Sequence, residues 1–134
     1  GMALATVRMG IHHGTGHVLG GTASVPHGIA NCIVLPHDMR FNADAVPEQL
    51  ALIAEAMGIQ RDGRSDYEMA LQAADHAQAF IKQLNMPYQL HQVGVEKTLL
   101  PQLANNLLLS KAVMSNPKPL ASENQALAYL TEMW

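Results

Sequence analysis

Apolar side chains recur every three or four residues along most of this chain, which is the spacing of one face of an α-helix. The clearest case follows Ser65, which forms with Glu68 the Ser-x-x-Glu pattern of an N-terminal capping box. The apolar stripe behind it consists of Tyr67, Ala70, Leu71, Ala74, Ala77, Ile81 and Leu84. The spacing therefore predicts one long helix between Ser65 and Asn85.

Other segments repeat this pattern. A helix is predicted between Pro47, in its first turn, and Gly58, its stop. A second capping box at Ser122–Gln125 precedes an apolar stripe made of Leu127, Leu130 and Trp134. The segment Glu96–Lys111 is also expected to be helical, with Pro101 delaying its start or kinking it.

Strands are not expected, apart from a short pairing around Tyr88 to Val93, because no clean alternation of apolar and polar residues is present. Short connections containing Gly, Asn and Pro separate the predicted helices. The predicted fold class is all-α, an antiparallel helical bundle, and residues 1–134 are predicted to form a single all-helical domain.

Composition limits what such a domain does. Its net charge of −3 gives no basic surface for nucleic acid or anionic lipid. No apolar run approaches the ~18 residues of a membrane helix, so no membrane role is expected. The single Cys32 excludes an internal disulfide and indicates a reducing compartment, the cytoplasm. With 49% apolar and 14% charged residues, part of the surface is expected to face another domain or subunit.

Five of the seven histidines lie between His12 and His37, among glycines and apolar residues. His13 and His17 are four residues apart, and thus on one helical face, while His27 follows Pro26 at the expected start of the next helix. Imidazoles from two helices that meet at one point are a common way of building a metal site. The alternative is that each histidine binds a carbonyl or is half-buried, and the spacing alone does not decide between them.

A longer pattern surrounds these histidines. Gly10–Gly21 reads GIHHGTGHVLGG, Pro26–His37 reads PHGIANCIVLPH, and Arg40-Phe-Asn follows; Asn116-Pro-Lys precedes the terminal helix. This order, with histidine spacings of four and ten, resembles the metal-binding signature of the iron-containing alcohol dehydrogenases. The resemblance covers essentially the whole chain.

The resemblance implies specific roles. Members of this family have an N-terminal α/β nucleotide-binding domain and a C-terminal helical domain, with a metal held in the cleft by one Asp and three His. His13 and His27 match the last two of those ligands. His17 matches a histidine implicated in contact with the nicotinamide cofactor and in proton relay, and thus in catalysis. The metal is expected to be Fe(II), with Zn or Ni also compatible with such ligands.

The departures from the family pattern define the expected function. The chain matches only about the last third of a family member, so the nucleotide-binding domain, the Asp and one His ligand are absent from it. NAD(P) is therefore expected only if a nucleotide-binding domain is supplied by another chain. The pair His12-His13 and the run VLGGT resemble the maleylacetate reductase branch, whereas PHGIAN is closer to the alcohol dehydrogenase branch. A small alcohol, an aldehyde and an unsaturated keto acid all remain candidate substrates.

Two functional hypotheses remain open. In the first, the chain is the metal-binding part of an oxidoreductase, inactive alone, with a nucleotide-binding partner chain or as a homo-oligomer. In the second, it is a standalone helical module that dimerises through its exposed apolar face and catalyses nothing. In a homodimer, His13 and His27 of two chains would together supply the ligands of one ion.

Overall fold

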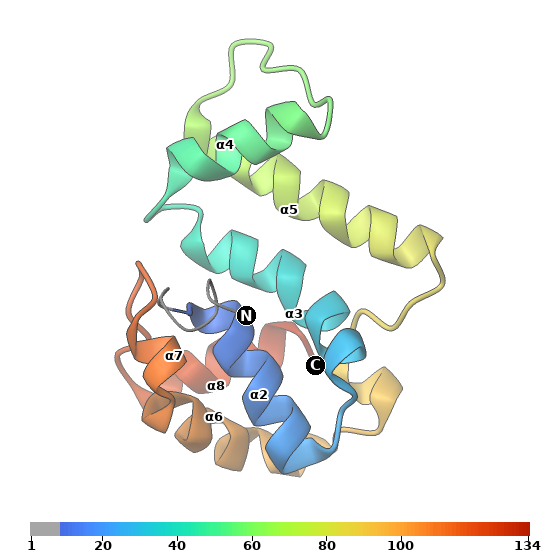
Figure 1. Cartoon of the computed structure of the whole chain (residues 1–134), viewed down its shortest axis with the longest axis vertical. Helices are drawn as coiled ribbons and strands as arrows, with labels where there is room; N and C mark the ends of the chain where they lie inside the picture. The colour runs from blue at the N-terminus through green and yellow to red at the C-terminus, as the bar shows by residue number, and fades with distance from the viewer. Residues whose placement is uncertain (1–8) are drawn as a thin grey trace, which may run out of the picture.

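The computed structural model describes residues 9–134, which form helices joined by short turns, with no β-strand among them (Figure 1). The α-helices are α2 (Ile11–Ala23), α3 (His27–Asn42), α4 (Pro47–Ala56), α5 (Asp66–Gln83), α6 (Leu100–Leu109), α7 (Lys111–Met114) and α8 (Glu123–Glu132). Two short 3-10 helices, η1 (Leu90–Val93) and η2 (Lys97–Leu99), lie between α5 and α6. The predicted all-α class is confirmed. None of the helices within 9–134 has the length and apolar character needed to cross a membrane.

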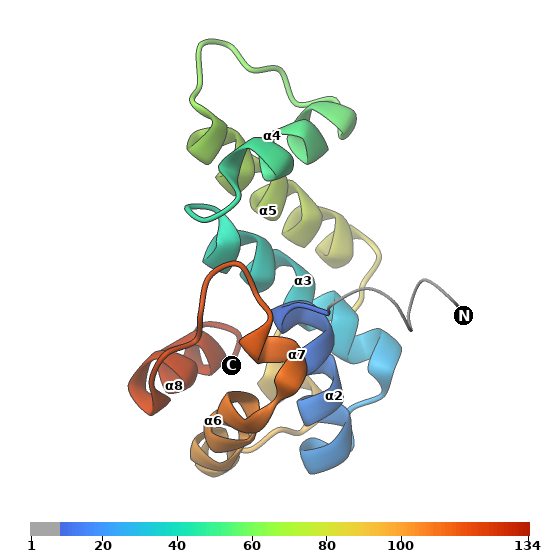
Figure 2. The same cartoon turned by 60° about the vertical axis from the view of Figure 1, so that its left-hand side comes forward.

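Helix α3 lies in the middle of the molecule and joins two groups of helices (Figure 1, Figure 2). On one side α4 packs along α5, and α5 packs on α3; a small core on this side includes Met39, Leu50 and Met69. On the other side α2, α6, α7 and α8 surround a larger core that includes Leu19 and Leu103. Because α3 contributes to both cores, it fixes the position of α2 relative to α4.

The helix boundaries follow local chemistry. Ser65 Oγ accepts a hydrogen bond from the Glu68 backbone at 3.3 Å, and Glu68 Oε2 accepts one from the Ser65 backbone at 2.8 Å, so the predicted capping box is formed. Helix α4 begins at Pro47, and Gly58 follows it with φ +85°. The predicted helices at these two places are confirmed.

The segment 96–111 is helical with the late start that Pro101 predicts. Its first turn is η2, and α6 begins at Leu100, which places Pro101 where no N–H is needed. The helix ends at Leu109, and Lys111 already belongs to α7.

Two local expectations are wrong. At Ser122 only half of the capping box forms, because Gln125 Oε1 accepts from the Ala121 backbone N–H instead of that of Ser122. The strand pairing expected around Tyr88–Val93 is replaced by η1. There Gln92 Oε1 accepts from the backbone N–H groups of Tyr88 and Gln89, so the side chain satisfies donors that a sheet would otherwise use.

Close packing of α2 against α7 depends on Gly14, and this gives a paired prediction. A Cβ on Gly14 would lie 2.6 Å from Val113 Cγ2 and 3.1 Å from the Val113 backbone nitrogen, whereas a Cβ on Gly21 of the same helix meets nothing within 4 Å. We expect Gly14→Ala to lower the free energy of unfolding by about 1–3 kcal/mol through overpacking. Gly21→Ala should raise it by up to about 1 kcal/mol through helix propensity.

Urea denaturation of the two variants measures both effects. Because the same substitution in the same helix is expected to change stability in opposite directions, an equal stabilisation of both variants would contradict the α2–α7 packing described here.

Candidate functional site

Helices α2 and α3 bring three of the predicted histidines together. The ring centroids of His13 and His17 are 4.2 Å apart, and the ring of His27 lies 6.0 Å from the first and 5.6 Å from the second. His13 and His17 lie on one face of α2, and His27 is the first residue of α3. The chain reverses between the helices at Ser24, whose φ of 54° is left-handed. The reversal places the start of α3 beside α2.

A glycine permits this approach. A Cβ on Gly16 would lie 3.2 Å from Asn31 Oδ1 and 3.3 Å from His27 Cε1, closer than such contacts normally are. Gly16 is buried, so a Cβ at this position would require the side chains of Asn31 and His27 to shift by a few tenths of an ångström. Asn31 Oδ1, next to the ring of His27, is buried and has no hydrogen-bond partner among residues 9–134.

The surroundings of His13 favour the neutral form of its ring. Desolvation lowers the pKa of His13, and the neighbouring His17, His27 and His12 lower it further. A neutral imidazole has a free lone pair, which is the state that binds a metal ion. His17 and His27 are exposed and His13 is half-buried, so a ligand can reach the cluster from solvent.

Three imidazoles alone do not complete a metal site here. In the part of the chain that the structure describes, no group of three or more His, Cys, Asp or Glu side chains is arranged to hold an ion. Catalytic metal sites usually have at least three protein ligands. The imidazoles described here therefore form at most part of a coordination sphere.

A second polar network lies directly beside this cluster. His12 Nδ1 is 2.8 Å from Asp38 Oδ2, the Tyr129 hydroxyl donates to Asp38 Oδ1, and Thr15 Oγ1 is 3.2 Å from that hydroxyl. These residues join the first turns of α2 to the middle of α3 and to α8. The network therefore holds His12, and with it the neighbouring His13, against α3.

Burial controls the charges in this network. Asp38 is only 4% exposed, and desolvation raises its pKa, while hydrogen bonds from His12 and Tyr129 act in the opposite direction. Burial also raises the pKa of Tyr129 well above its usual value, and the nearby Asp38 carboxylate adds to this effect. Tyr129 therefore remains a neutral donor that stabilises the buried carboxylate.

Asn116 fixes the beginning of α2. Its Oδ1 accepts a hydrogen bond from the Ile11 backbone at 3.1 Å, and its Nδ2 donates to Asn42 Oδ1 at 2.6 Å and to the Lys118 carbonyl at 2.8 Å. Because Gly10 provides no side-chain cap, this amide satisfies a donor that would otherwise be free. Asn42, at the end of α3, holds the Asn116 side chain in this position.

The sequence did not identify this second network. From the sequence, His12 distinguishes one branch of the family from another, and no pattern assigns a role to Asp38 or Tyr129. The partners are 26 and 91 residues apart, so no helical spacing connects them. The available signal was an acidic side chain inside an apolar run, since a buried carboxylate requires hydrogen-bond donors.

His37 belongs to neither network. It lies well inside α3 and is 7% exposed. Its Nε2 is buried without a hydrogen-bond partner among the described residues. Desolvation and the nearby Arg40 lower the pKa of His37 to about 4, so the ring is neutral at pH 7.

Comparison with known proteins identifies the family of this domain. Residues 1–133 match the model of the C-terminal domain of the Fe-containing alcohol dehydrogenase family. The chain is 37% identical over 131 residues to the lactaldehyde reductase of Escherichia coli (strain K12), covering 98% of this chain and 34% of that protein. It is 30% identical over 130 residues to the maleylacetate reductase of Pseudomonas sp. (strain P51), covering 97% and 33%.

A solved structure shows the same fold. The crystal structure of a 1,3-propanediol oxidoreductase superposes with a TM-score of 0.86 at 34% identity, covering 93% of this chain and 32% of that one. The chain belongs to the Fe-containing alcohol dehydrogenase family and corresponds to its C-terminal domain. It spans about one third of the length of the curated relatives that it matches.

The buried His37 predicts a pH dependence of stability. Its pKa is about 4 in the folded protein and 6.5 as the ordinary value, so between these values the unfolded chain binds more protons. We expect the free energy of unfolding to fall as the pH decreases from about 6.5 towards 4, by up to about 3 kcal/mol from this residue.

The comparison of wild type with His37→Leu isolates this contribution, because leucine does not titrate. The pKa of Asp38 is raised, so its contribution to the free energy of unfolding changes with pH in the opposite direction. This contribution is present in both proteins and cancels in the difference between them. Urea unfolding at several pH values, in the presence of a chelator, measures how the free energy of unfolding of each protein changes with pH. Parallel curves for the two proteins would show that His37 is not buried in the neutral form.

Proposed function

We propose that this chain is the metal-binding part of an NAD(P)-dependent oxidoreductase of the iron-containing alcohol dehydrogenase type. His13 and His27 coordinate the ion through their imidazole nitrogens, and His17 contacts the cofactor and relays a proton. The observation that carries this proposal is the convergence of the three rings, with centroids 4.2–6.0 Å apart, at the point where α2 and α3 meet.

The residues around the rings fit such a centre in part. Neutral imidazoles suit Fe(II), and also Zn or Ni, and Gly16 leaves space that a Cβ would fill. A divalent ion bound there would polarise a substrate oxygen and lower the pKa of an alcohol. The chain itself would orient His13 and His27 through α2 and α3 and expose His17 to a bound cofactor.

A small alcohol or aldehyde is our proposed substrate. The identity of 37% to a lactaldehyde reductase exceeds the 30% to a maleylacetate reductase, which favours the former branch. The paired His12-His13 leaves an unsaturated keto acid as the second possibility.

We propose that a nucleotide-binding domain supplies NAD(P) and the remaining ligands, that the protein acts with a nucleotide-binding partner chain or as a homo-oligomer, and that residues 1–134 alone are inactive. Exposed apolar side chains suit such a contact; they include Leu35, Ile53, Met57, Phe80 and Leu84. The free Cys32 agrees with a reducing, cytoplasmic location.

A second candidate function is a helical dimerisation module without catalysis. It is favoured by the absence of a complete metal-binding group within residues 9–134. In that case the histidines would be remnants of an ancestral site, and metal binding would be weak and insensitive to them.

A metal titration separates these proposals. Metal-free protein is titrated anaerobically with Fe(II), and separately with Zn(II), by calorimetry, and bound metal is quantified after desalting. We expect His13→Ala and His27→Ala each to weaken binding at least about tenfold, or about 1.4 kcal/mol. His76→Ala serves as the matched control, because His76 is an exposed histidine on α5 and no contact places it near the cluster.

The stoichiometry adds further information. One ion per two chains would favour a homodimeric site, whereas equal binding by wild type and both cluster variants would contradict the proposed ligands. Oxidation of NADH with an aldehyde by this chain alone would contradict the proposed need for a nucleotide-binding partner.

A further inference from the structure

The side chain of Asn31 carries a buried carbonyl oxygen that lacks a donor. Asn31 lies on α3, four residues after His27, and its Oδ1 has no hydrogen-bond partner among residues 9–134. A buried amide oxygen in a folded protein nearly always accepts a hydrogen bond, because it has lost its contact with water. A donor is therefore expected within reach of this atom.

The ring of His27 lies beside this oxygen and can supply the donor. A Cβ on Gly16 would lie 3.2 Å from Asn31 Oδ1, 3.3 Å from His27 Cε1 and 3.5 Å from His27 Nδ1. These atoms therefore border the same small space next to α2, and Nδ1 is the nearer of the two ring nitrogens to it. Residues four apart lie on one face of a helix and their side chains lean towards its N-terminus, so Asn31 extends towards the turn that carries His27.

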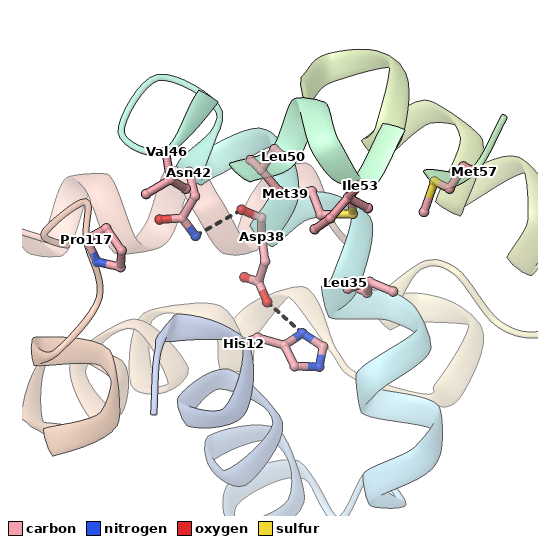
Figure 3. A pocket seen from close by; sticks show the side chains of 10 residues that line it. All are labelled: His12, Leu35, Asp38, Met39, Asn42, Val46, Leu50, Ile53, Met57 and Pro117. Carbon is pink, nitrogen blue, oxygen red and sulfur yellow. Dashed lines mark hydrogen bonds and ion pairs between the residues drawn. The ribbon is translucent and has the colours of Figure 1, made fainter. Parts of the chain in front are cut away.

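The other histidine on this side of α2 has no hydrogen to offer. His12 lies at the edge of an apolar cavity of about 440 Å³ between α2, α3 and α4, and its ring turns to Asp38 (Figure 3). His12 Nδ1 is 2.8 Å from Asp38 Oδ2. Because the carboxylate accepts from Nδ1, the neutral ring of His12 carries no hydrogen on Nε2. This leaves His27 as the imidazole that can donate to Asn31.

We propose that Asn31 is a positioning residue for His27, whose Nδ1–H donates a hydrogen bond to Asn31 Oδ1. His27 is exposed, so its ring can turn towards Asn31 without displacing a buried group. Gly16 has no side chain that would occupy the space between them. The bond gives the buried oxygen its donor and fixes both the tautomer and the orientation of the ring.

This contact assigns the coordinating atom of His27. With the hydrogen on Nδ1, the lone pair is on Nε2, and it points away from Asn31 because the two ring nitrogens face nearly opposite directions. A hydrogen bond to the second nitrogen of a metal-binding histidine commonly orients the ring and raises the basicity of the ligand nitrogen. This last step, in which Nε2 binds the ion, rests on the function proposed above, whereas the Asn31–His27 contact does not.

Two substitutions of Asn31 test the contact. Asn31→Leu removes the acceptor and keeps the size of the side chain, whereas Asn31→Asp keeps an oxygen at the same position. Asn105→Leu is the matched control, because Asn105 is an exposed asparagine on α6. Any effect of the contact should therefore appear in Asn31→Leu and be rescued in Asn31→Asp.

The first measurement is the tautomer of His27 in metal-free protein. Protein labelled with ¹⁵N is studied in the presence of a chelator at pH ~8.5, where an ordinary imidazole is neutral. Long-range ¹H–¹⁵N spectra show which ring nitrogen carries the hydrogen, and the signals of His27 are those lost in His27→Ala. We expect Nδ1–H in the wild type, in Asn31→Asp and in Asn105→Leu. In Asn31→Leu the hydrogen should move largely to Nε2, which free histidine prefers.

The second measurement is the affinity for Zn(II), determined by calorimetry. We expect Asn31→Leu to weaken binding about tenfold, in the range found when a group that orients a metal ligand is removed. Asn31→Asp and Asn105→Leu should bind at least as tightly as the wild type. A loss of packing alone would change neither the tautomer of the wild type nor its rescue by aspartate.

The two measurements separate this inference from the proposed function. A hydrogen on Nε2 of His27 in the wild type would overturn the contact, and this result needs no substitution to fold. The same tautomer in Asn31→Leu as in the wild type, or an Asn31→Asp variant that behaves like Asn31→Leu, would also overturn it, even if His27 binds Zn(II). The expected tautomers combined with Zn(II) binding that does not depend on His27 would support the contact and contradict the proposed function.

Discussion

The close approach of α2 to α3 is the interaction on which the rest of this structure depends. Two contacts maintain it. Gly16 lets the start of α3 lie against α2, and the hydrogen bond between His12 and Asp38 joins the first turn of α2 to the middle of α3. Because α3 also packs on α5, and α5 packs on α4, this one junction helps to position both the histidine cluster and the cavity beside it.

Adjacent residues on α2 face different environments as a consequence. His13 points to the cluster with His17 and His27, while His12 is held by Asp38 at the edge of an apolar cavity. Two neighbouring imidazoles thus have separate partners and separate chemistry. The polar network around Asp38 forms because this buried carboxyl group needs hydrogen-bond partners, which His12 and Tyr129 supply.

The sequence predicted the parts of this structure that depend on local patterns. The capping box at Ser65, the late start of the helix near Pro101 and the meeting of the histidines all follow from spacing or family resemblance. Features that depend on residues far apart in the chain were not predictable. The Asp38–Tyr129 contact joins positions 91 residues apart. In the segment where a strand was expected, the Gln92 side chain accepts a hydrogen bond from the Tyr88 backbone, and the segment forms η1 instead.

A nuclear Overhauser experiment on metal-free protein tests the convergence of the rings most directly, because it needs neither metal nor cofactor. The His27 ring centroid lies 6.0 Å from that of His13 and 5.6 Å from that of His17, which predicts cross-peaks between the ring protons of α2 and those of His27. Cross-peaks between α2 and α3 backbones without any between these rings would contradict the central claim, since the helices would then pack without bringing the imidazoles together.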